Sequence, residues 1–278
     1  MKNFITRTLT AIAIVAVQVL CTYLSPLSLA GLFLLFTALT VNELLGILAK
    51  QGVVKVNRPI IIVGSCYLFF AFWLNSLTQG EALIIFAPYL LFLMYSYIKE
   101  LYNRHPNPIV NLGATMFSQM YIVLPLSLIN VLAFKRFDCF SGETMFYSIP
   151  LAIYIFIWVN DTGAYLFGVT LGKHRLFPRI SPKKSWEGSI GGALLTLACA
   201  YAVAQIAPFM NVWQWMGMAL VVVVSGTFGD LTESMIKRHL GIKDSGNMLP
   251  GHGGILDRLD SMLFAIPATV VYLLMISL

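Results

Sequence analysis

Nine apolar runs dominate the sequence, and each is long enough to cross a lipid bilayer as an α-helix. A spanning helix needs about 20 predominantly apolar residues to cross a hydrocarbon layer of about 30 Å. The runs lie approximately at 8–24, 27–49, 59–78, 81–98, 109–134, 145–171, 187–208, 212–235 and 259–277. The breaks between them are polar or carry proline and glycine, as at Ser25-Pro26. The pattern predicts an all-α, polytopic integral membrane protein with about nine transmembrane helices.

Composition supports the same class. Hydrophobic residues make up 58% of the 278-residue chain and charged residues 11%, whereas an ordinary soluble domain is about 25% charged. No break is long enough for a soluble domain, because the two longest run only from Leu171 to Trp186 and from Lys237 to Asp257. We therefore expect one integral membrane domain over residues 1–278. It would consist of N-terminal helices in 1–150 and of further helices and long loops in 151–278.

The distribution of Lys and Arg predicts the orientation in the membrane. With nine spans, the N-terminus and the loops after the even-numbered spans share one side. That side carries 16 of the 18 basic residues: Lys2, Arg7, Lys50, Lys55, Arg58, Lys99, Arg104, Lys173, Arg175, Arg179, Lys183, Lys184, Lys237, Arg238, Lys243 and Arg258. Positive residues stay on the cytoplasmic side, so we expect a cytoplasmic N-terminus and cytoplasmic long loops. The same bias explains the net charge of +6 without a nucleic acid partner.

Acidic residues in or beside the spans are candidates for function, because a charge at the bilayer centre costs about 2.5–3.5 kcal/mol on the insertion scale. Asp161 falls deepest in its span, with Gly163 close by. Glu43 falls toward the cytoplasmic end of the second span. For Glu43, a hydrated charge at the interface is an equally good explanation.

A second group of acids lies where the eighth span ends and the ninth begins. Asp257 and Asp260 are three residues apart, as are Asp230 and Glu233, so each pair shares a helical face. Clustered carboxylates suit Mg²⁺, which is usually held by one or two carboxylates together with substrate phosphates. The four histidines are scattered, which disfavours zinc.

The loop after the sixth span is suited to bind phosphate. It reads Ser181-Pro182-Lys183-Lys184-Ser185, and we expect a helix to begin at Ser185 or just after it. Free N–H groups and the helix dipole at such a start favour anions. Non-specific contact with lipid headgroups explains Lys183 and Lys184 as well, but it does not explain the Ser-Pro turn or the glycines at 188, 191 and 192.

The loop after the eighth span combines basic residues, glycines and carboxylates. Four bases in it are placed to contact phosphates: Lys237, Arg238, Lys243 and Arg258. His252 is followed by Gly253 and Gly254, whose exposed N–H groups can form an anion nest. The next helix opens with Asp257 and Arg258. Phosphates, a divalent ion and a lipid surface are therefore expected to meet here.

At these residues the sequence resembles the phosphatidate cytidylyltransferases, also called CDP-diacylglycerol synthases. The family signature, with its Lys-Arg, Lys-Asp and His-Gly-Gly-x-x-Asp-Arg-x-x-Asp elements, is met at every fixed position between Ser234 and Asp260. The segments 158–165 and 181–188 resemble two further family elements, Trp/Asp/Ala-Tyr and Ser-Pro-Lys-Lys. The resemblance is dense from about 155 to 260, whereas residues 1–150 match only in hydropathy and topology.

The resemblance implies a function. CTP and phosphatidate would give CDP-diacylglycerol and pyrophosphate, in phospholipid biosynthesis at the cytoplasmic face of the cell inner membrane. The family uses Mg²⁺, which implies a metal centre at Asp230 and Asp257 and, less directly, Asp260; a second cation and a homodimer are left open. Catalytic roles fall to Asp230, Asp257, Lys184, Arg258 and Asp161, and phosphate binding to Lys183, Lys237, Arg238, Lys243, His252, Gly253 and Gly254.

Two other classes remain as alternatives. Another CTP-using membrane lipid enzyme, such as a polyprenol or phytol kinase or an archaeal-lipid cytidylyltransferase, is disfavoured by the intact pattern of 234–260. A transporter would place charges near the membrane midplane between repeated halves. Only Asp161 approaches the midplane, and we see no internal repeat.

Overall fold

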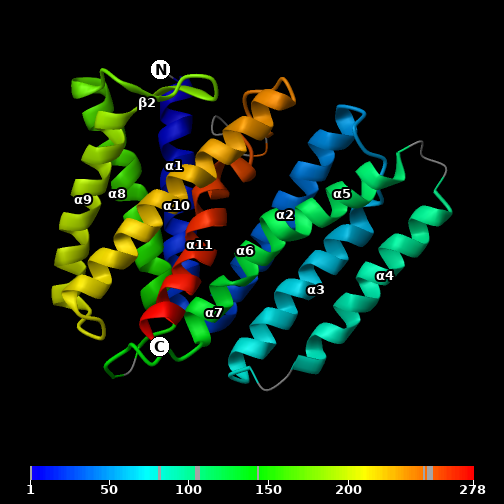
Figure 1. Ribbon diagram of the computed structural model, residues 1–278, viewed down its shortest axis with the longest axis horizontal. Helices are drawn as coiled ribbons and strands as arrows, with labels where there is room; N and C mark the ends of the chain where they lie inside the picture. The colour runs from blue at the N-terminus through cyan, green and yellow to red at the C-terminus, as the bar shows by residue number, and fades with distance from the viewer. Residues whose placement is uncertain (1, 81–82, 104–106, 143, 247, 249–252) are drawn as a thin grey trace. The chain divides into compact units, whose positions relative to one another are not determined.

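The structure is a computed structural model of the 278-residue chain (Figure 1). It describes residues 2–80, 83–103, 107–142, 144–246, 248 and 253–278, with side chains from residue 10 onward. The chain divides into two compact units, Met1–Lys135 with Asp244–Arg258, and Arg136–Lys243 with Leu259–Leu278. That the whole chain is one membrane domain remains a prediction.

The first unit contains the N-terminal helices. They are α1 (Lys2–Leu24), α2 (Pro26–Lys50), α3 (Arg58–Leu77), the 3₁₀ turn η1 (Leu83–Phe86), α4 (Ala87–Leu101), α5 (Pro108–Ser118), the π-helical turn η2 (Gln119–Val123), α6 (Leu124–Ser127) and α7 (Ile129–Phe134). Helix α2 packs against α1 and α3, and α3 packs against α6 and α7.

The second unit contains α8 (Ser148–Leu171), a hairpin of β1 (Arg175–Phe177) and β2 (Ser181–Ser185), α9 (Trp186–Ile206) and α10 (Val212–His239). Helix α11 (Leu256–Ile276) begins in the first unit and continues in the second. The hydroxyl of Tyr272 in α11 donates to the carbonyl oxygen of Gln214 in α10 over 2.8 Å, which ties these two helices together.

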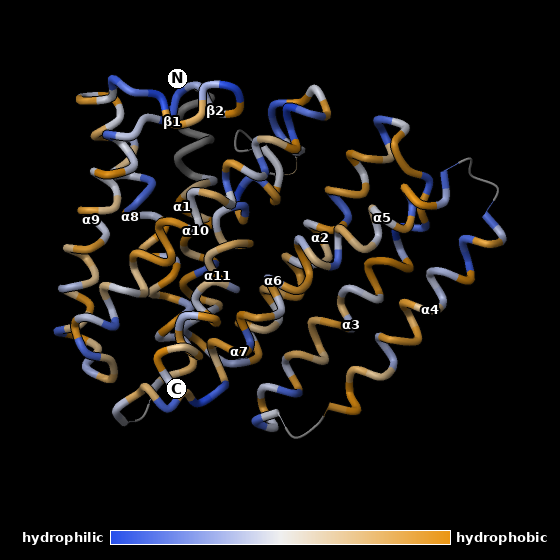
Figure 2. Tube along the Cα trace, viewed as in Figure 1, coloured by the Kyte–Doolittle hydropathy of each residue, from blue (hydrophilic) through white to orange (hydrophobic). Residues whose placement is uncertain are grey.

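The prediction of a polytopic helical membrane protein is confirmed. Among the described residues, eight helical segments are long and apolar enough to cross a membrane, and α1 adds a shorter apolar helix, Thr10–Leu24. Figure 2 shows the hydrophobic residues along the spanning helices and hydrophilic residues around β1 and β2. Within the described residues, each of the nine predicted runs therefore coincides for most of its length with helical segments. The short β1–β2 hairpin was not predicted, because the apolar pattern does not extend into that loop.

Polar residues between the apolar runs fix where helices begin. Ser25 caps α2 through the backbone N–H of Ser28, and Pro26 occupies the first turn. Asn57 and Asn211 cap α3 and α10 in the same way. Such caps satisfy backbone N–H groups that have no partner within the helix, so these short polar breaks set the register of the spans.

Helices α8 and α9 approach closely because glycines line their contact. A Cβ at Gly163 of α8 would lie 2.9 Å from the Cα of Gly192 in α9, and a Cβ at Gly192 would lie 2.6 Å from the carbonyl oxygen of Asn160. A Cβ at Gly188 would lie 2.7 Å from the carbonyl oxygen of Ala164. Small residues allow membrane helices to pack at short distance. The glycines at 188 and 192 therefore have a packing role next to the Ser-Pro-Lys-Lys loop.

Replacement of Gly192 by alanine should destabilise the protein. The added Cβ must displace α8 backbone, and overpacking of this kind costs about 1–3 kcal/mol, against a helix-propensity gain of about 1 kcal/mol. The control is Gly113→Ala in α5, where a Cβ meets nothing within 4 Å. Thermal unfolding in detergent should show a lower midpoint for Gly192→Ala than for Gly113→Ala, which has the same gain in helix propensity. Equal midpoints, or a higher one for Gly192→Ala, would contradict the close contact.

Candidate active site

The predicted phosphate loop is a β-hairpin that leads directly into α9. Strands β1 and β2 are antiparallel, with Arg175 opposite Ser185 and Phe177 opposite Ser181. The backbone N–H of Trp186 donates to the carbonyl oxygen of His174 over 2.9 Å. Ser185 caps α9 by accepting from the N–H of Gly188. The predicted helix start at Ser185 or just after it is thus confirmed.

Glu187 in the first turn of α9 closes the base of this hairpin. Its carboxylate accepts hydrogen bonds from the backbone N–H groups of Lys173 and His174, at 3.1 and 3.2 Å. It also contacts Nδ1 of His174 at 2.5 Å. These contacts hold the two ends of the hairpin together and leave Lys183 exposed and Lys184 half-buried on β2.

Lys184 connects the hairpin to α10. Its ammonium group forms an ion pair with Oδ2 of Asp230, and both side chains are about 30% exposed (29% and 30%). The Ser234 hydroxyl lies 3.4 Å from Oδ1 of Asp230, one helical turn further on. The structure therefore brings together two residues that the sequence predicted for the site in separate motifs.

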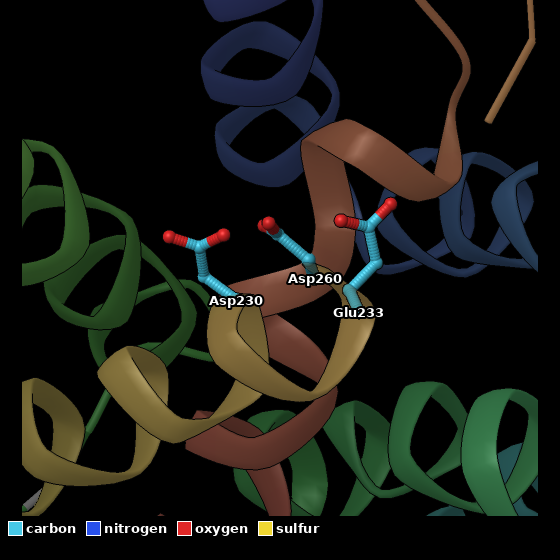
Figure 3. A group of neighbouring side chains, drawn as sticks. All are labelled: Asp230, Glu233 and Asp260. Carbon is cyan, nitrogen blue, oxygen red and sulfur yellow. The ribbon is translucent and has the colours of Figure 1, made fainter. Parts of the chain in front are cut away.

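Asp230 belongs to a cluster of three carboxylates, drawn in Figure 3. One oxygen atom each of Asp230, Glu233 and Asp260 lies within 4.8 Å of the others. Asp260 comes from α11, which approaches α10 where Gly229 leaves room for its backbone. The N–H of Ser261 donates to Oδ1 of Asp260 over 2.7 Å. In Figure 3 the three carboxylates lie in a row and point the same way.

Two lysines partly neutralise this cluster. Lys184 pairs with Asp230, and Lys237, one helical turn beyond Glu233, pairs with the fully buried Glu233 carboxylate. The cluster holds one more carboxyl group than lysine, which leaves oxygen atoms that can serve as ligands for a cation. Hard carboxylate oxygens are the ligands that Mg²⁺ prefers, and the donor set of Asp230, Glu233 and Asp260 fits that ion.

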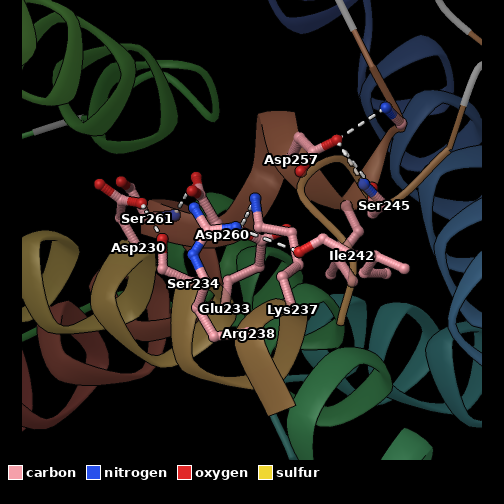
Figure 4. Close-up of polar contacts among 12 residues, drawn as sticks. Asp230, Glu233, Ser234, Lys237, Arg238, Ile242, Ser245, Asp257, Asp260 and Ser261 are labelled. Carbon is pink, nitrogen blue, oxygen red and sulfur yellow. Dashed lines mark hydrogen bonds and ion pairs between the residues drawn. The ribbon is translucent and has the colours of Figure 1, made fainter. Parts of the chain in front are cut away.

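Asp257 holds together a different segment, within the first unit. Its Oδ2 accepts three hydrogen bonds: from the backbone N–H of Ser245 at 3.0 Å, from the Ser245 hydroxyl at 2.9 Å and from the N–H of Gly254 at 2.8 Å (Figure 4). The N–H of Gly254 is therefore already donated within the protein. The sharing of one metal ion by Asp230 and Asp257 remains a prediction.

The other predicted residues differ in their surroundings. Arg238 donates to the carbonyl oxygen of Ile242 over 3.1 Å and so closes the end of α10 (Figure 4). Gly253 has a φ of +80°, a conformation that glycine adopts most readily. His252 lies outside the described residues. Arg238 is exposed, as are Asp161, Lys243 and Arg258.

The sequence matches a known protein family over nearly its whole length. The sequence profile of the cytidylyltransferase family matches residues 5–276. The chain belongs to the cytidylyltransferase family. The match extends over both units, including the N-terminal helices for which the sequence motifs gave no resemblance.

Several curated phosphatidate cytidylyltransferases are similar in sequence to a part of this chain. A phosphatidate cytidylyltransferase of Staphylococcus aureus (strain COL) is 50% identical over 125 residues, which are 45% of this chain and 48% of the relative. Those of Staphylococcus haemolyticus and Staphylococcus epidermidis are 45% identical over the same length. The chain thus spans about half the length of the curated relatives it matches.

Sequence reasoning left two acids of this cytidylyltransferase-family chain out of the predicted site. Glu233 joins the carboxylate cluster, and its spacing of three residues from Asp230 was the available signal. Glu43 contacts the segment around Ser245 and Ile255. No local pattern reveals that contact, because its partners lie more than 200 residues further along the chain.

The carboxylate cluster predicts a measurable response to Mg²⁺ without substrates. Mg²⁺ that binds the folded protein should raise its unfolding midpoint in detergent. Asp230→Asn should raise the Mg²⁺ concentration for half of this effect about tenfold, because one charged ligand is lost. Asp138→Asn, a change at an exposed acid in the same unit, is the control. Identical Mg²⁺ titrations for both variants would rule out a metal ligand at Asp230.

Proposed function

We propose that the protein is a phosphatidate cytidylyltransferase that converts CTP and phosphatidate into CDP-diacylglycerol and pyrophosphate. One observation carries the proposal. In a family of cytidylyltransferases, the Lys184 of one motif is paired with the Asp230 of a second segment, beside further carboxylates and Lys237. The staphylococcal relatives are phosphatidate cytidylyltransferases, which supports the same reaction.

The reaction joins two anionic groups. A phosphate oxygen of phosphatidate forms a bond to the α-phosphorus of CTP, and the bond from that phosphorus to the bridging oxygen of pyrophosphate breaks. The nucleophile is already an anion near neutral pH, so a strong general base is dispensable. Transfer of this kind depends on positioning and on neutralisation of negative charge. Paired lysines beside a carboxylate cluster are suited to both tasks.

The lysines of the cluster would contact phosphate oxygens of the substrates. Lys184 is held by Asp230 and Lys237 by Glu233 before any substrate arrives. An entering phosphate can take over part of these contacts without a large movement of either side chain. Lys183, Arg238, Lys243, Arg258 and His252 with Gly253 and Gly254 complete the proposed set for the two substrates.

Mg²⁺ is the proposed cofactor, with Asp230, Asp257 and Asp260 as predicted ligands and Glu233 as a fourth candidate carboxylate. When bound, Mg²⁺ would neutralise the CTP phosphates and stabilise pyrophosphate as it leaves. A second cation and a homodimer remain predictions. Asp161, exposed on α8, remains a predicted catalytic residue.

The proposed orientation places the site at the cytoplasmic face of the inner membrane. The basic residues of the long loops support this orientation through the positive-inside rule. Phosphatidate would enter sideways from the membrane lipids, and CTP would enter from the cytoplasm. Loops that carry most of the basic residues and face the cytoplasm would be accessible to both substrates.

The purified protein, incubated in detergent with phosphatidate and Mg²⁺, tests the proposal. CTP labelled in the cytosine ring should transfer its label to the lipid phase, and CTP labelled in the γ-phosphate should not. Lipid labelled only from the γ-phosphate would identify a lipid kinase instead. No transfer from either label, with phosphatidate in excess, would overturn the proposal.

Lys184→Gln should reduce catalytic efficiency by about tenfold or more, because it removes a charge-assisted contact of about 1.5–3 kcal/mol. Lys184→Arg should restore only part of the catalytic efficiency, since a planar guanidinium does not replace a compact ammonium. The control is Lys173→Gln, an exposed lysine just before the hairpin. The measurement is kcat/KM over a range of CTP and phosphatidate. If Lys184→Gln has wild-type catalytic efficiency, the loop makes only non-specific contacts with lipid headgroups.

A further inference from the structure

Glu43 is a buried carboxylate in a membrane-spanning helix that the predicted reaction does not use. It lies in α2, where its side chain is 9% exposed, with Leu44 and Leu45 next to it in the chain also buried. Burial of an ionised carboxylate among apolar side chains is costly unless hydrogen bonds compensate for the lost water. The contacts of Glu43 therefore indicate why a carboxylate is present there.

The carboxylate of Glu43 caps a helix from another part of the chain. Its Oε2 accepts from the backbone N–H of Ile255 at 2.9 Å, and its Oε1 accepts from the N–H of Leu256 at 3.3 Å. Helix α11 begins at Leu256. The first N–H groups of a helix have no partner within it and favour negative charge, so Glu43 fixes the point at which α11 starts.

Glycines allow the loop before α11 to reach this carboxylate. A Cβ at Gly254 would run into Oε1 of Glu43 and the Ser245 hydroxyl, and a Cβ at Gly246 would lie 3.2 Å from the Glu43 carboxylate. The contact with Glu43 thus explains why glycine is needed at position 254 of the family signature, without any role in phosphate binding. The glycine leaves room for the side chain of a helix about 200 residues earlier in the sequence.

Ser245 links Glu43 to Asp257. The Ser245 hydroxyl contacts Oε1 of Glu43 and also lies 2.9 Å from Oδ2 of Asp257. Both contacts belong to the first unit. A hydroxyl has one proton and two lone pairs, so it donates to one of these carboxyl groups and can accept from the other only when that one is protonated. With Ser245 and Gly254 bound to Oδ2, the Asp257 carboxylate has one defined orientation.

We propose that Glu43 is a positioning residue, which orients Asp257 through Ser245 and through the start of α11. Hydrogen-bonded partners behind a functional carboxylate commonly change activity by 10–100-fold when removed. The consequence for turnover rests on the proposed cytidylyltransferase activity. The geometric consequence, a fixed position of residues 253–256 at the start of α11, does not.

Variants at Glu43 separate these two consequences. Glu43→Ala removes both acceptors, and Glu43→Gln keeps the size of the side chain with one acceptor oxygen. Matched variants at Glu100 serve as controls, because this partly buried carboxylate in the same unit instead accepts from Asn103 and Asn111. All are measured on the full chain in detergent, by hydrogen exchange and by steady-state kinetics.

Hydrogen exchange of fragments that cover 253–258 should become faster in Glu43→Ala, with Glu43→Gln between it and the wild type. The Glu100 variants should leave this segment unchanged. In the kinetics, kcat of Glu43→Ala should fall about tenfold or more at saturating substrates, while the KM for CTP changes less than about threefold. If Glu43 had only a structural role, the Glu43 and Glu100 variants would both show a lower unfolding midpoint, and the Glu43 variants would not show a fall in kcat with a nearly unchanged KM for CTP.

A double variant tests the link through Ser245. The loss of kcat in Glu43→Ala should be much smaller in a Ser245→Ala background, because both changes act on the same carboxylate. If the fold-reductions of kcat in the two single variants multiply in the double variant, the link through Ser245 is wrong. If hydrogen exchange at 253–258 in Glu43→Ala equals that of the wild type, the positioning role is wrong. If the wild-type protein transfers no cytidylyl group, the proposed function fails and the exchange result alone decides the role of Glu43.

Discussion

The cost of charge in a lipid environment constrains this structure more than any other interaction. A carboxylate in a spanning helix is tolerated when hydrogen-bond donors or a positive charge lie beside it. Glu43 in α2 receives backbone N–H groups from the start of α11, and Glu233 in α10 pairs with Lys237. Asp230 pairs with a lysine from the β1–β2 hairpin. The contacts of Glu43 and Asp230 connect segments that apolar packing alone would leave without a unique register.

Polar contacts also hold the β1–β2 hairpin in place. A five-residue strand such as β2 has little apolar surface to bury. It is held by the contacts of Glu187 with Lys173 and His174 at its base and by the ion pair of Lys184 at its end. A charged loop that is fixed in this way presents its lysines in a defined place, which is what the proposed transfer of a cytidylyl group requires.

The elements that the sequence predicted well are those with a local cause. Span lengths follow from the apolar runs, and the starts of α2 and α9 follow from Ser25-Pro26 and Ser185. The pairing of Lys184 with Asp230 has no local signal, because it depends on a hairpin that the apolar pattern does not encode. In the sequence, the glycines at 188 and 192 favour a phosphate loop, whereas in the structure they allow α9 to approach α8.

Glu43 shows that composition and residue spacing cannot predict the role of an acidic residue near a membrane interface. From the sequence, a single acid near the end of a span is equally consistent with hydration and with function. The two explanations differ only in what the carboxylate contacts, and its partners are Ser245, Ile255 and Leu256. Since Gly254 must lack a side chain for this contact to form, the glycine of the motif and the acid of α2 are parts of one arrangement. A change at either position should therefore disturb the start of α11 in the same way.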